Sequence, residues 1–295
     1  MGTTYNTTGE TKSSKIQTNA ARIFSYIFLI FVTFLSLFPM FLLLVNSTRS
    51  HMQLSQPGNF SLLPSTYFVN NIKLATAGGG LTRGLLNSFI VAAGASVLST
   101  YFSAMTAYGV HVYDFKLKKF AFNFIMVVMM IPTQISAIGF IKMVNGWKLN
   151  NTFWPLIIPA IAAPAVFFYM KQYIEGALPM EVIEAARVDG ASEFRTFNTI
   201  SLPMIFPAMA VQLIFAFTSA WNNYFIPSLI LDKNNVKTVP ILIATLRSDV
   251  ASGGSAGDWG KVYMTVLIAI IPVVIVYIFV SKHIVGGVAL GAVKG

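Results

Sequence analysis

Six long apolar runs without Asp, Glu, Lys or Arg constrain this fold more than any other feature of the 295-residue sequence. They cover residues 23–45, 85–110, 120–141, 152–170, 205–231 and 262–280. About 20 apolar residues of α-helix cross the roughly 30 Å hydrocarbon core of a bilayer, and a helix satisfies its own backbone hydrogen bonds there. We therefore predict an all-α membrane protein with six transmembrane helices and both termini on one side.

The composition favours the same class and excludes several chemistries. Hydrophobic residues make up 55 % of the chain and charged residues 10 %, whereas soluble domains contain about 25 % charged residues. The chain has no cysteine, which excludes disulfides, thiolate catalysis and cysteine-ligated zinc, and its three histidines are scattered. The net charge of +10 comes from dispersed residues, so we expect no nucleic-acid partner.

Any transport by this chain is expected to draw on an energy source outside it. Sodium coupling through backbone carbonyls and hydroxyls is the alternative, but no pair of broken helices in corresponding halves suggests the inverted repeat typical of such carriers. The spans carry no ionisable side chain that would serve as an ion relay. No Gly-x-x-x-x-Gly-Lys-Ser/Thr loop for nucleotide phosphates occurs, and the nearest fragment, Gly260-Lys261-Val262, lacks the leading glycine and the hydroxyl. We predict that the chain is not an enzyme and holds no metal or cofactor.

Charge at the span ends predicts the orientation. Lys116, Lys118 and Lys119 crowd the nine-residue loop between the second and third runs. Short loops rich in lysine face the cytoplasm, which predicts that both termini are cytoplasmic. The expected organisation is an N-terminal tail over residues 1–22, a six-helix transmembrane domain over 23–280 and a C-terminal tail over 281–295. Residues 1–20 are expected to be disordered because they are polar and poor in aromatics.

The long polar segment between the fourth and fifth runs, residues 171–204, predicts two short helices. Pro179 suits the first turn of a helix, Glu184 and Arg187 form an i,i+3 pair, and Gly190 suits a left-handed cap. A second helix over 191–200, ended by Pro203, places an apolar face at Phe194, Phe197 and Ile200. Such a face either inserts into a partner's groove or lies on the bilayer.

This segment resembles the Glu-Ala-Ala loop of the membrane subunits of ABC importers. The resemblance rests on Glu184-Ala185-Ala186, on Gly190 after three intervening residues and on Ile200-x-Leu202-Pro203 after nine more. Asp189-Gly190-Ala191-Ser192 is similar to the carbohydrate-uptake branch and to the maltose G-type permeases. Further matches lie at Met130-Ile131-Pro132, Asn150-Asn151-Thr152, Trp221-Asn222 and the terminal Gly291-Ala292-Val293-Lys294-Gly295.

The resemblance implies a type I ABC importer permease that meets its ATPase through this loop. The implied coupling residues are Glu184, Ala185, Ala186, Asp189, Gly190, Ile200, Leu202 and Pro203. The implied partners are a second, F-type permease forming a heterodimer, two ATP-binding subunits, an extracytoplasmic solute-binding protein, a carbohydrate and membrane lipid. Gly291, Lys294 and Gly295 are expected to contact the ATPase; the alternative is a flexible terminus.

Aromatic and amide side chains suggest a sugar path in the spans. The candidates are Trp221, Asn222, Asn223, Tyr224, Gln212, Ser219 and Gln134, with Ser88 as a further one. Sugar sites combine aromatic faces with amide and hydroxyl groups, but interfacial belts and helix–helix hydrogen bonds use the same residue types. The outer loops, 46–84 and 232–261, are expected to be flexible and to meet the solute-binding protein.

The sequence therefore predicts an ATP-driven permease subunit in the bacterial inner membrane that moves a carbohydrate, an oligosaccharide, into the cytoplasm by alternating access. A stand-alone secondary carrier or channel for a small polar solute is the alternative. A membrane-embedded enzyme is the third reading, and it lacks convergent polar groups at depth.

Overall fold

The computed structural model describes residues 12–56, 61–254 and 257–292, and every regular element in this part of the chain is a helix. In chain order these are α1 (Lys12–Ser47), α2 (His51–Ser55), α3 (Phe68–Thr76), η1 (Ala77–Gly79), α4 (Gly80–Val112), α5 (Lys118–Met129), α6 (Thr133–Gly146), α7 (Trp154–Ile157), η2 (Ile158–Ile161), α8 (Pro164–Ala177), α9 (Met180–Val188), α10 (Glu193–Arg195), η3 (Thr196–Ser201), α11 (Leu202–Trp221), α12 (Phe225–Ile230), α13 (Val239–Ala251) and α14 (Trp259–Ala292). The predicted all-α class is confirmed.

Five helical stretches among the described residues are long and apolar enough to cross a membrane. They are Arg22–Ser47, Phe68–Val112, Trp154–Ala177, Glu193–Trp221 and Trp259–Ser281. The third predicted span is not one straight helix, because α5 and α6 are bent by 94° at a short break. Pro132 caps α6, and a proline both lacks an N–H and disfavours helical geometry in the residue before it. The bent pair makes a sixth span if it is counted as one.

Several predicted boundaries were wrong. The fifth span ends at Trp221 and not at residue 231, because Asn222 caps α11 and a separate short helix, α12, follows. Asparagine favours helix ends because its side chain competes for backbone hydrogen bonds. The last predicted span, 262–280, agrees at its end with the candidate span Trp259–Ser281, and its helix α14 continues beyond the span to Ala292. The first helix begins at Lys12, so the second half of the predicted disordered tail is helical; residues 1–11 lie outside the described part.

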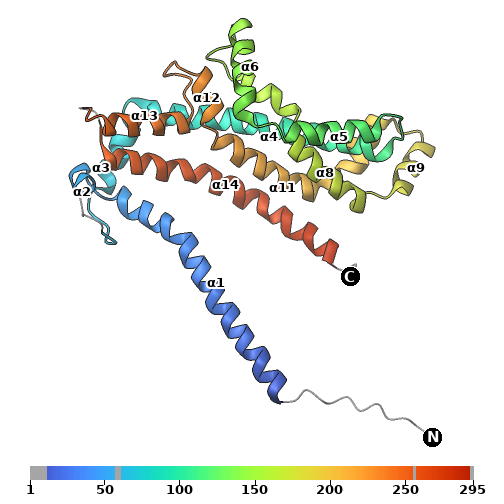
Figure 1. Cartoon of the computed structure of the whole chain (residues 1–295), viewed down its shortest axis with the longest axis horizontal. Coiled ribbons are helices and arrows are strands. Elements are labelled where there is room, and N and C mark those ends of the chain that lie inside the picture. Colours follow the sequence, from blue (N-terminus) through green and yellow to red (C-terminus); the bar gives the residue numbers. More distant parts are fainter. Residues whose placement is uncertain (1–11, 57–60, 255–256, 293–295) are drawn as a thin grey trace.

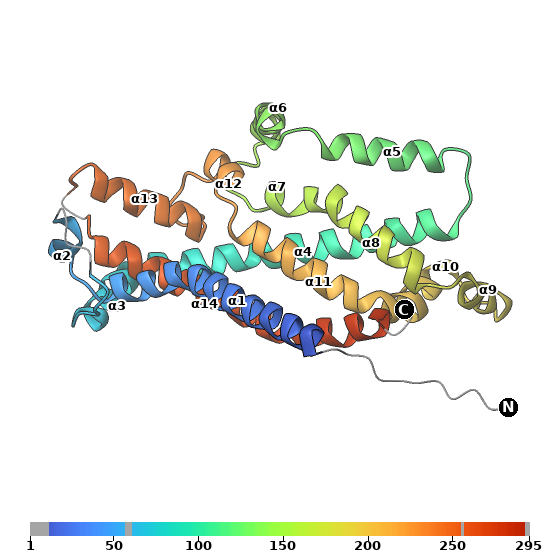
Figure 2. The same cartoon turned by 60° about the horizontal axis from the view of Figure 1, so that its bottom comes forward.

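The helices form an elongated bundle with two distinct ends (Figure 1). The helices α4, α8, α11 and α14 run alongside one another, whereas α1 diverges from them toward its N-terminal end. Figure 2 shows α9 and α10 at one end and α2, α3 and α13 at the other. The outer loops, expected to be flexible, contain the helices α3 and α13, and both pack against α14.

The main core lies between α4, α8 and α11 and extends into the polar segment. On α4, Ala104 and Ala107 are fully buried, and small residues let helix backbones approach closely. Phe167 and Met170 of α8 and Ile205 of α11 pack in the same cluster. Ile183 of α9 and Phe197 of η3 also belong to it. The end of the bundle is therefore built on the same core as the spans.

Candidate functional site

The first half of the polar segment forms the helix α9, as predicted. Pro179 is its N-cap rather than a first-turn residue, and Glu181 lies in its first turn, where a carboxylate is favoured by the helix dipole. Gly190 has a φ of +74°, which confirms the predicted left-handed turn. The N–H of Gly190 donates to the Arg187 carbonyl and that of Ala191 to the Ala186 carbonyl. This pair of bonds is a Schellman cap.

The second predicted helix does not end at Pro203. The short helix α10 runs through the π-helical turn η3 directly into α11, so the helical path is continuous from Glu193 to Trp221. Pro203 has no N–H to donate to the carbonyl four residues earlier and its ring crowds that carbonyl. In the π turn, the Leu202 N–H reaches back five residues to the Phe197 carbonyl. The proline therefore widens the helix instead of terminating it.

Phe197 anchors this continuous helix to α4. Its ring lies 5.7 Å from that of Tyr101 and 5.3 Å from that of Tyr108, centroid to centroid. Only 2 % of Phe197 is exposed, so the predicted apolar face of Phe194, Phe197 and Ile200 is divided. Phe197 faces the core, Ile200 is half-buried and Phe194 is exposed. The π turn changes the angular spacing of these side chains around the helix, so that Phe197 is buried in the core while Phe194 points outward.

A polar cluster joins α9, α10 and α4. Arg187 Nε donates to Glu193 Oε1 at 2.7 Å, so the predicted pair of Arg187 with Glu184 was wrong. The Tyr108 hydroxyl donates to Glu193 Oε2 at 3.3 Å, and the Arg187 guanidinium lies 5.6 Å from the centre of the Tyr113 ring. Burial, followed by the nearby Glu193 carboxylate, raises the pKa of Tyr113. An exposed pair of this kind adds little stability; it links α9 to α10 across the turn at Gly190.

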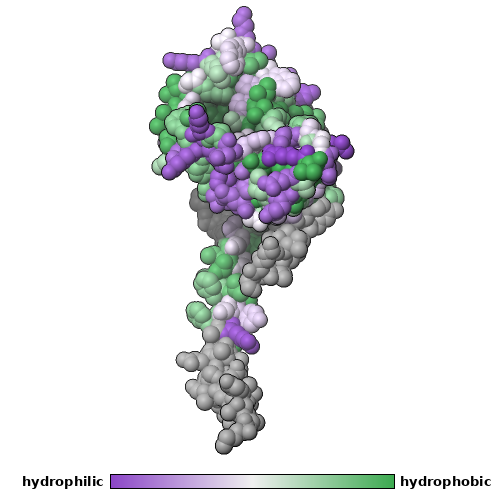
Figure 3. All heavy atoms as spheres, turned by 90° about the vertical axis from the view of Figure 1, so that its right-hand side faces the viewer, coloured by the Kyte–Doolittle hydropathy of each residue, from purple (hydrophilic) through white to green (hydrophobic). Residues whose placement is uncertain are grey.

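The outward surface of the segment is small and partly apolar. We call it the α9 tip and define it as Glu184, Ala185, Val188, Asp189 and Phe194, all of which are exposed. Val188 is 87 % exposed and Phe194 68 %. Figure 3 views this end of the molecule, where hydrophilic side chains gather with apolar ones among them. The α9 tip therefore carries two exposed apolar side chains at a polar end of the molecule.

The remaining predicted coupling residues face inward or flank the tip. Ala186 is buried against the bundle, Leu202 is half-buried and Pro203 is exposed. Gly291 lies in the last turn of α14. Lys294 and Gly295 lie outside the described residues.

A cavity of about 880 Å³ lies between α4, α8 and α11 and reaches the start of α6. Three predicted sugar-path residues, Gln212, Ser219 and Asn223, line it. Sequence reasoning missed the aromatic residues Tyr169 and Phe215, as well as the hydroxyls of Ser99 and Thr133. Tyr169 and Phe215 are 59 % and 65 % exposed, so this chain leaves one side of the cavity open.

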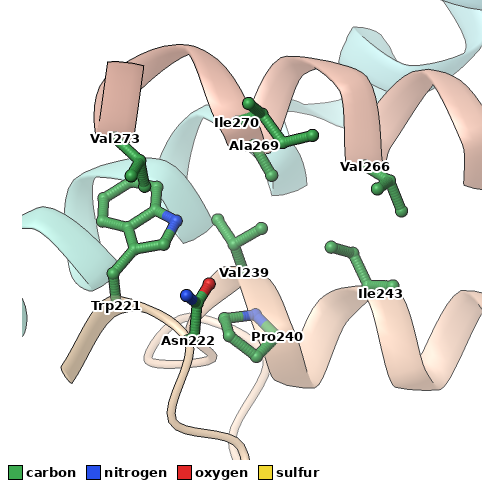
Figure 4. A pocket seen from close by; sticks show the side chains of 9 residues that line it. All are labelled: Trp221, Asn222, Val239, Pro240, Ile243, Val266, Ala269, Ile270 and Val273. Atoms are coloured by element: carbon green, nitrogen blue, oxygen red, sulfur yellow. The ribbon is translucent and has the colours of Figure 1, made fainter. Parts of the chain in front are cut away.

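Trp221 and Asn222 belong to a different cavity. Figure 4 shows them beside Val239, Pro240 and Val273, in a space of about 410 Å³ between the end of α11, α13 and α14. Trp221 is buried and stacks on Phe217 at 5.7 Å between centroids. The four consecutive candidates at 221–224 therefore do not form one site, because α11 ends among them.

The other sugar-path candidates line neither cavity. Tyr224 and Gln134 are exposed elsewhere. Ser88 is buried, and its Oγ accepts the Val239 N–H at 2.8 Å, which makes it a structural residue joining α4 to α13. Within the part of the chain that the structure describes, no group of three or more His, Asp or Glu side chains is arranged to hold a metal ion.

Comparison with known proteins assigns the chain to a family. Residues 99–285 match the model of the binding-protein-dependent transport system inner membrane component. The arabinooligosaccharides transport system permease protein AraQ of Bacillus subtilis is 31 % identical over 95 % of this chain and 98 % of its own length. The sn-glycerol-3-phosphate transport system permease protein UgpE of Salmonella typhi is 29 % identical over 90 % of this chain and 95 % of its own.

A solved structure supports the same fold. The crystal structure of a bacterial ABC transporter involved in the import of the acidic polysaccharide alginate contains a chain with a TM-score of 0.74 and 19 % identity, covering 94 % of this chain and 99 % of that one. The fold is thus that of a multi-pass helical membrane protein. The chain belongs to the family of binding-protein-dependent transport system inner membrane components, and it is a permease subunit and not an enzyme.

The two phenylalanines of the segment are expected to behave oppositely on truncation. Phe197→Ala removes a buried ring and is expected to cost about 3–5 kcal/mol of unfolding free energy. Phe194→Ala, three residues away on the exposed side, is expected to change it by less than about 0.5 kcal/mol. Thermal unfolding of the purified protein in mild detergent measures both. Similar losses for the two variants would contradict the assignment of Phe197 to the core.

Proposed function

We propose that this chain is one of two transmembrane subunits of an ATP-driven importer that carries a carbohydrate, of the oligosaccharide class, into the cytoplasm by alternating access. The observation that carries the proposal is the α9 tip, which presents exposed apolar residues at the polar end while Ile183, one residue from Glu184, is fully buried in the core of the bundle. An ATP-binding subunit that holds the tip therefore holds the whole end of the bundle.

The coupling works through the helices on either side of the tip. When the ATP-binding subunits close, they draw the tip along. The helix α11 follows because it is continuous with η3, and α8 follows because it packs in the same core as α9 and η3. Such a transition needs two discrete arrangements, each with its own contacts. Glu184 and Asp189 at the tip offer carboxylates to the partner, and Ala185 permits close approach. Gly291, Lys294 and Gly295 supply a second contact to the same partner.

The large cavity supplies the chemistry for a sugar. Tyr169 and Phe215 offer aromatic faces, and Gln212, Ser219 and Asn223 offer hydrogen-bonding groups. Among the described residues, no Lys, Arg or His lines the cavity. This favours an uncharged solute, such as the arabinooligosaccharides named for one relative, over the glycerol phosphate named for another. Sites that bury a drug-sized ligand measure about 300–1,000 Å³, so the cavity suits a solute of several rings.

The open side of the cavity needs a second protein. A second permease subunit that covers Tyr169 and Phe215 would complete the passage as a heterodimer. The exposed apolar residues of α1, which diverges from the bundle, offer further contact to that subunit or to lipid.

The proposed orientation puts the end with α9 in the cytoplasm, where the ATP-binding subunits would meet the tip. The end with α2, α3 and α13 would then face an extracytoplasmic solute-binding protein. Both chain termini are proposed to be cytoplasmic, as the lysines of the loop at 116–119 predict. Residues 23–280 form the permease domain, flanked by the tails 1–22 and 281–295.

Gly190 is the residue whose replacement separates assembly from coupling. Proline fixes φ near −65°, whereas Gly190 needs +74° and donates its N–H to Arg187. Gly190→Pro is expected to leave the complex assembled but abolish substrate-stimulated ATP hydrolysis in proteoliposomes. Gly176→Ala is the control, because Gly176 is helical and an added Cβ meets no atom within 4 Å. Unchanged stimulation in Gly190→Pro would overturn the coupling role.

The sugar path is tested with two tyrosines. Tyr169→Ala removes an aromatic face from the cavity and is expected to weaken sugar binding by up to about tenfold, since an aromatic contact contributes about 0.5–1.5 kcal/mol. Tyr224→Ala is the matched control, because Tyr224 is exposed but does not line the cavity. Equilibrium binding of the transported sugar to the purified complex without its binding protein decides the matter. Equal effects of the two substitutions would place the path elsewhere.

A further inference from the structure

A third cavity, of about 430 Å³, lies where α4, the start of α5 and the end of α8 meet. Its lining is dominated by basic side chains, which are His111, Lys116, Lys118, Lys119 and Lys171. Asp114 and Glu175 are the acidic residues in the lining. Four lysines against two carboxylates leave the cavity with a positive charge, which attracts an anion.

The basic residues of this cavity differ in whether their charge already has a partner within the chain. Lys171 Nζ lies 2.6 Å from Glu175 Oε1 and 4.8 Å from the centre of the Phe122 ring. Among the described residues, Lys116, Lys118 and Lys119 take part in neither of the two ion pairs found. We call these three the loop lysines. The charge available to a ligand therefore comes mainly from the loop lysines.

An exposed apolar face begins directly beside the loop lysines. Leu117, Phe120 and Phe124 are all more than half exposed. Phe120 and Phe124 stack along α5 with 6.2 Å between ring centroids. An exposed apolar face on a membrane helix suits contact with lipid acyl chains. The site is thus basic at one end and apolar along the other. It complements an anionic phospholipid, which has a negatively charged headgroup and apolar acyl chains.

We propose that this cavity binds the headgroup of an anionic phospholipid, such as phosphatidylglycerol, whose acyl chains lie along Leu117, Phe120 and Phe124. Basic pockets between membrane helices on the cytoplasmic side bind anionic headgroups. The apolar face distinguishes this ligand from free phosphate, which would gain nothing from the phenylalanines. The phosphate oxygens accept from the loop lysines and from Lys171, and Glu175 limits how much of the charge of Lys171 the lipid receives.

The lipid site adjoins the coupling segment. The His111 ring nitrogen Nε2 lies 3.0 Å from the carbonyl oxygen of Leu178, the residue that caps α8 and precedes the N-cap of α9. His111 also lines the lipid cavity. The headgroup would therefore sit beside the contact that joins α4 to the root of α9. Only the assignment to the cytoplasmic leaflet rests on the proposed function; the site itself does not.

Native mass spectrometry of the full chain, released from mild neutral detergent, tests the site directly. The probes are phosphatidylglycerol and zwitterionic phosphatidylcholine with the same acyl chains. The test variant carries Lys116→Gln, Lys118→Gln and Lys119→Gln. The matched control carries Lys73→Gln, Lys148→Gln and Lys233→Gln, three exposed lysines outside the cavity. Each lysine near an anionic lipid is worth about fivefold in binding, so the test variant is expected to bind phosphatidylglycerol on the order of a hundredfold more weakly.

The outcomes are distinct. Loss of phosphatidylglycerol in the test variant, with retention in the control and unchanged phosphatidylcholine in both, supports the site. If the wild type, the test variant and the control variant all retain phosphatidylglycerol equally, the site is overturned. It is also overturned if the wild-type protein binds phosphatidylglycerol no better than phosphatidylcholine, and that result does not depend on the folding of any variant. Inorganic phosphate or soluble glycerol phosphate that displaces the lipid at equal concentration overturns the lipid as ligand. The double variant Phe120→Ala, Phe124→Ala is expected to weaken lipid binding and to leave binding of inorganic phosphate unchanged.

Discussion

The burial of Phe197 between Tyr101 and Tyr108 is the interaction on which the rest of the arrangement depends. It fixes the π turn η3 against α4, and Ile183 fixes α9 in the same core. The exposed α9 tip is thereby held on both sides by buried residues. Close-packed interiors transmit displacement instead of absorbing it, so a force on the tip reaches the bundle.

The helices that flank the tip are also the helices that line the large cavity. The helix α8 carries Tyr169 and leads into α9, and α11 carries Gln212 and Ser219 and continues from η3. The same helices thus join the proposed partner surface, the α9 tip, to the proposed solute cavity. Glu193 links α10 to both α9 and α4, because its carboxylate accepts from Arg187 and from Tyr108. No separate relay is required between the two sites.

The sequence predicted the features that depend on local chemistry. Uncharged apolar runs located the membrane helices, and the position of Gly190 gave the left-handed turn because a glycine there suits that backbone. Prolines were ambiguous, since Pro132 breaks a span whereas Pro203 only widens a helix. A proline has the same local effect at both places, and its neighbours in the fold decide whether the helix continues.

Features that depend on tertiary contacts were not predictable from spacing. Phe194 and Phe197 look equivalent in the sequence, and only the position of Tyr101 and Tyr108 on α4 decides which one is buried. Arg187 pairs with Glu193 because the turn at Gly190 brings α10 back beside α9. Tyr169 was missed for a similar reason, because an aromatic residue in an apolar span usually faces lipid.

The most direct test of the account is whether the coupling segment moves as one body with the bundle. The chain has no cysteine, so spin labels can be attached at Glu181→Cys on α9 and Thr106→Cys on α4, two exposed positions outside the tip and the cavities. Double electron–electron resonance on the assembled transporter then gives their separation with and without ATP. The account predicts the same distance distribution in both states. A distribution that shifts with ATP would show that α9 moves independently of α4 and would contradict the central claim.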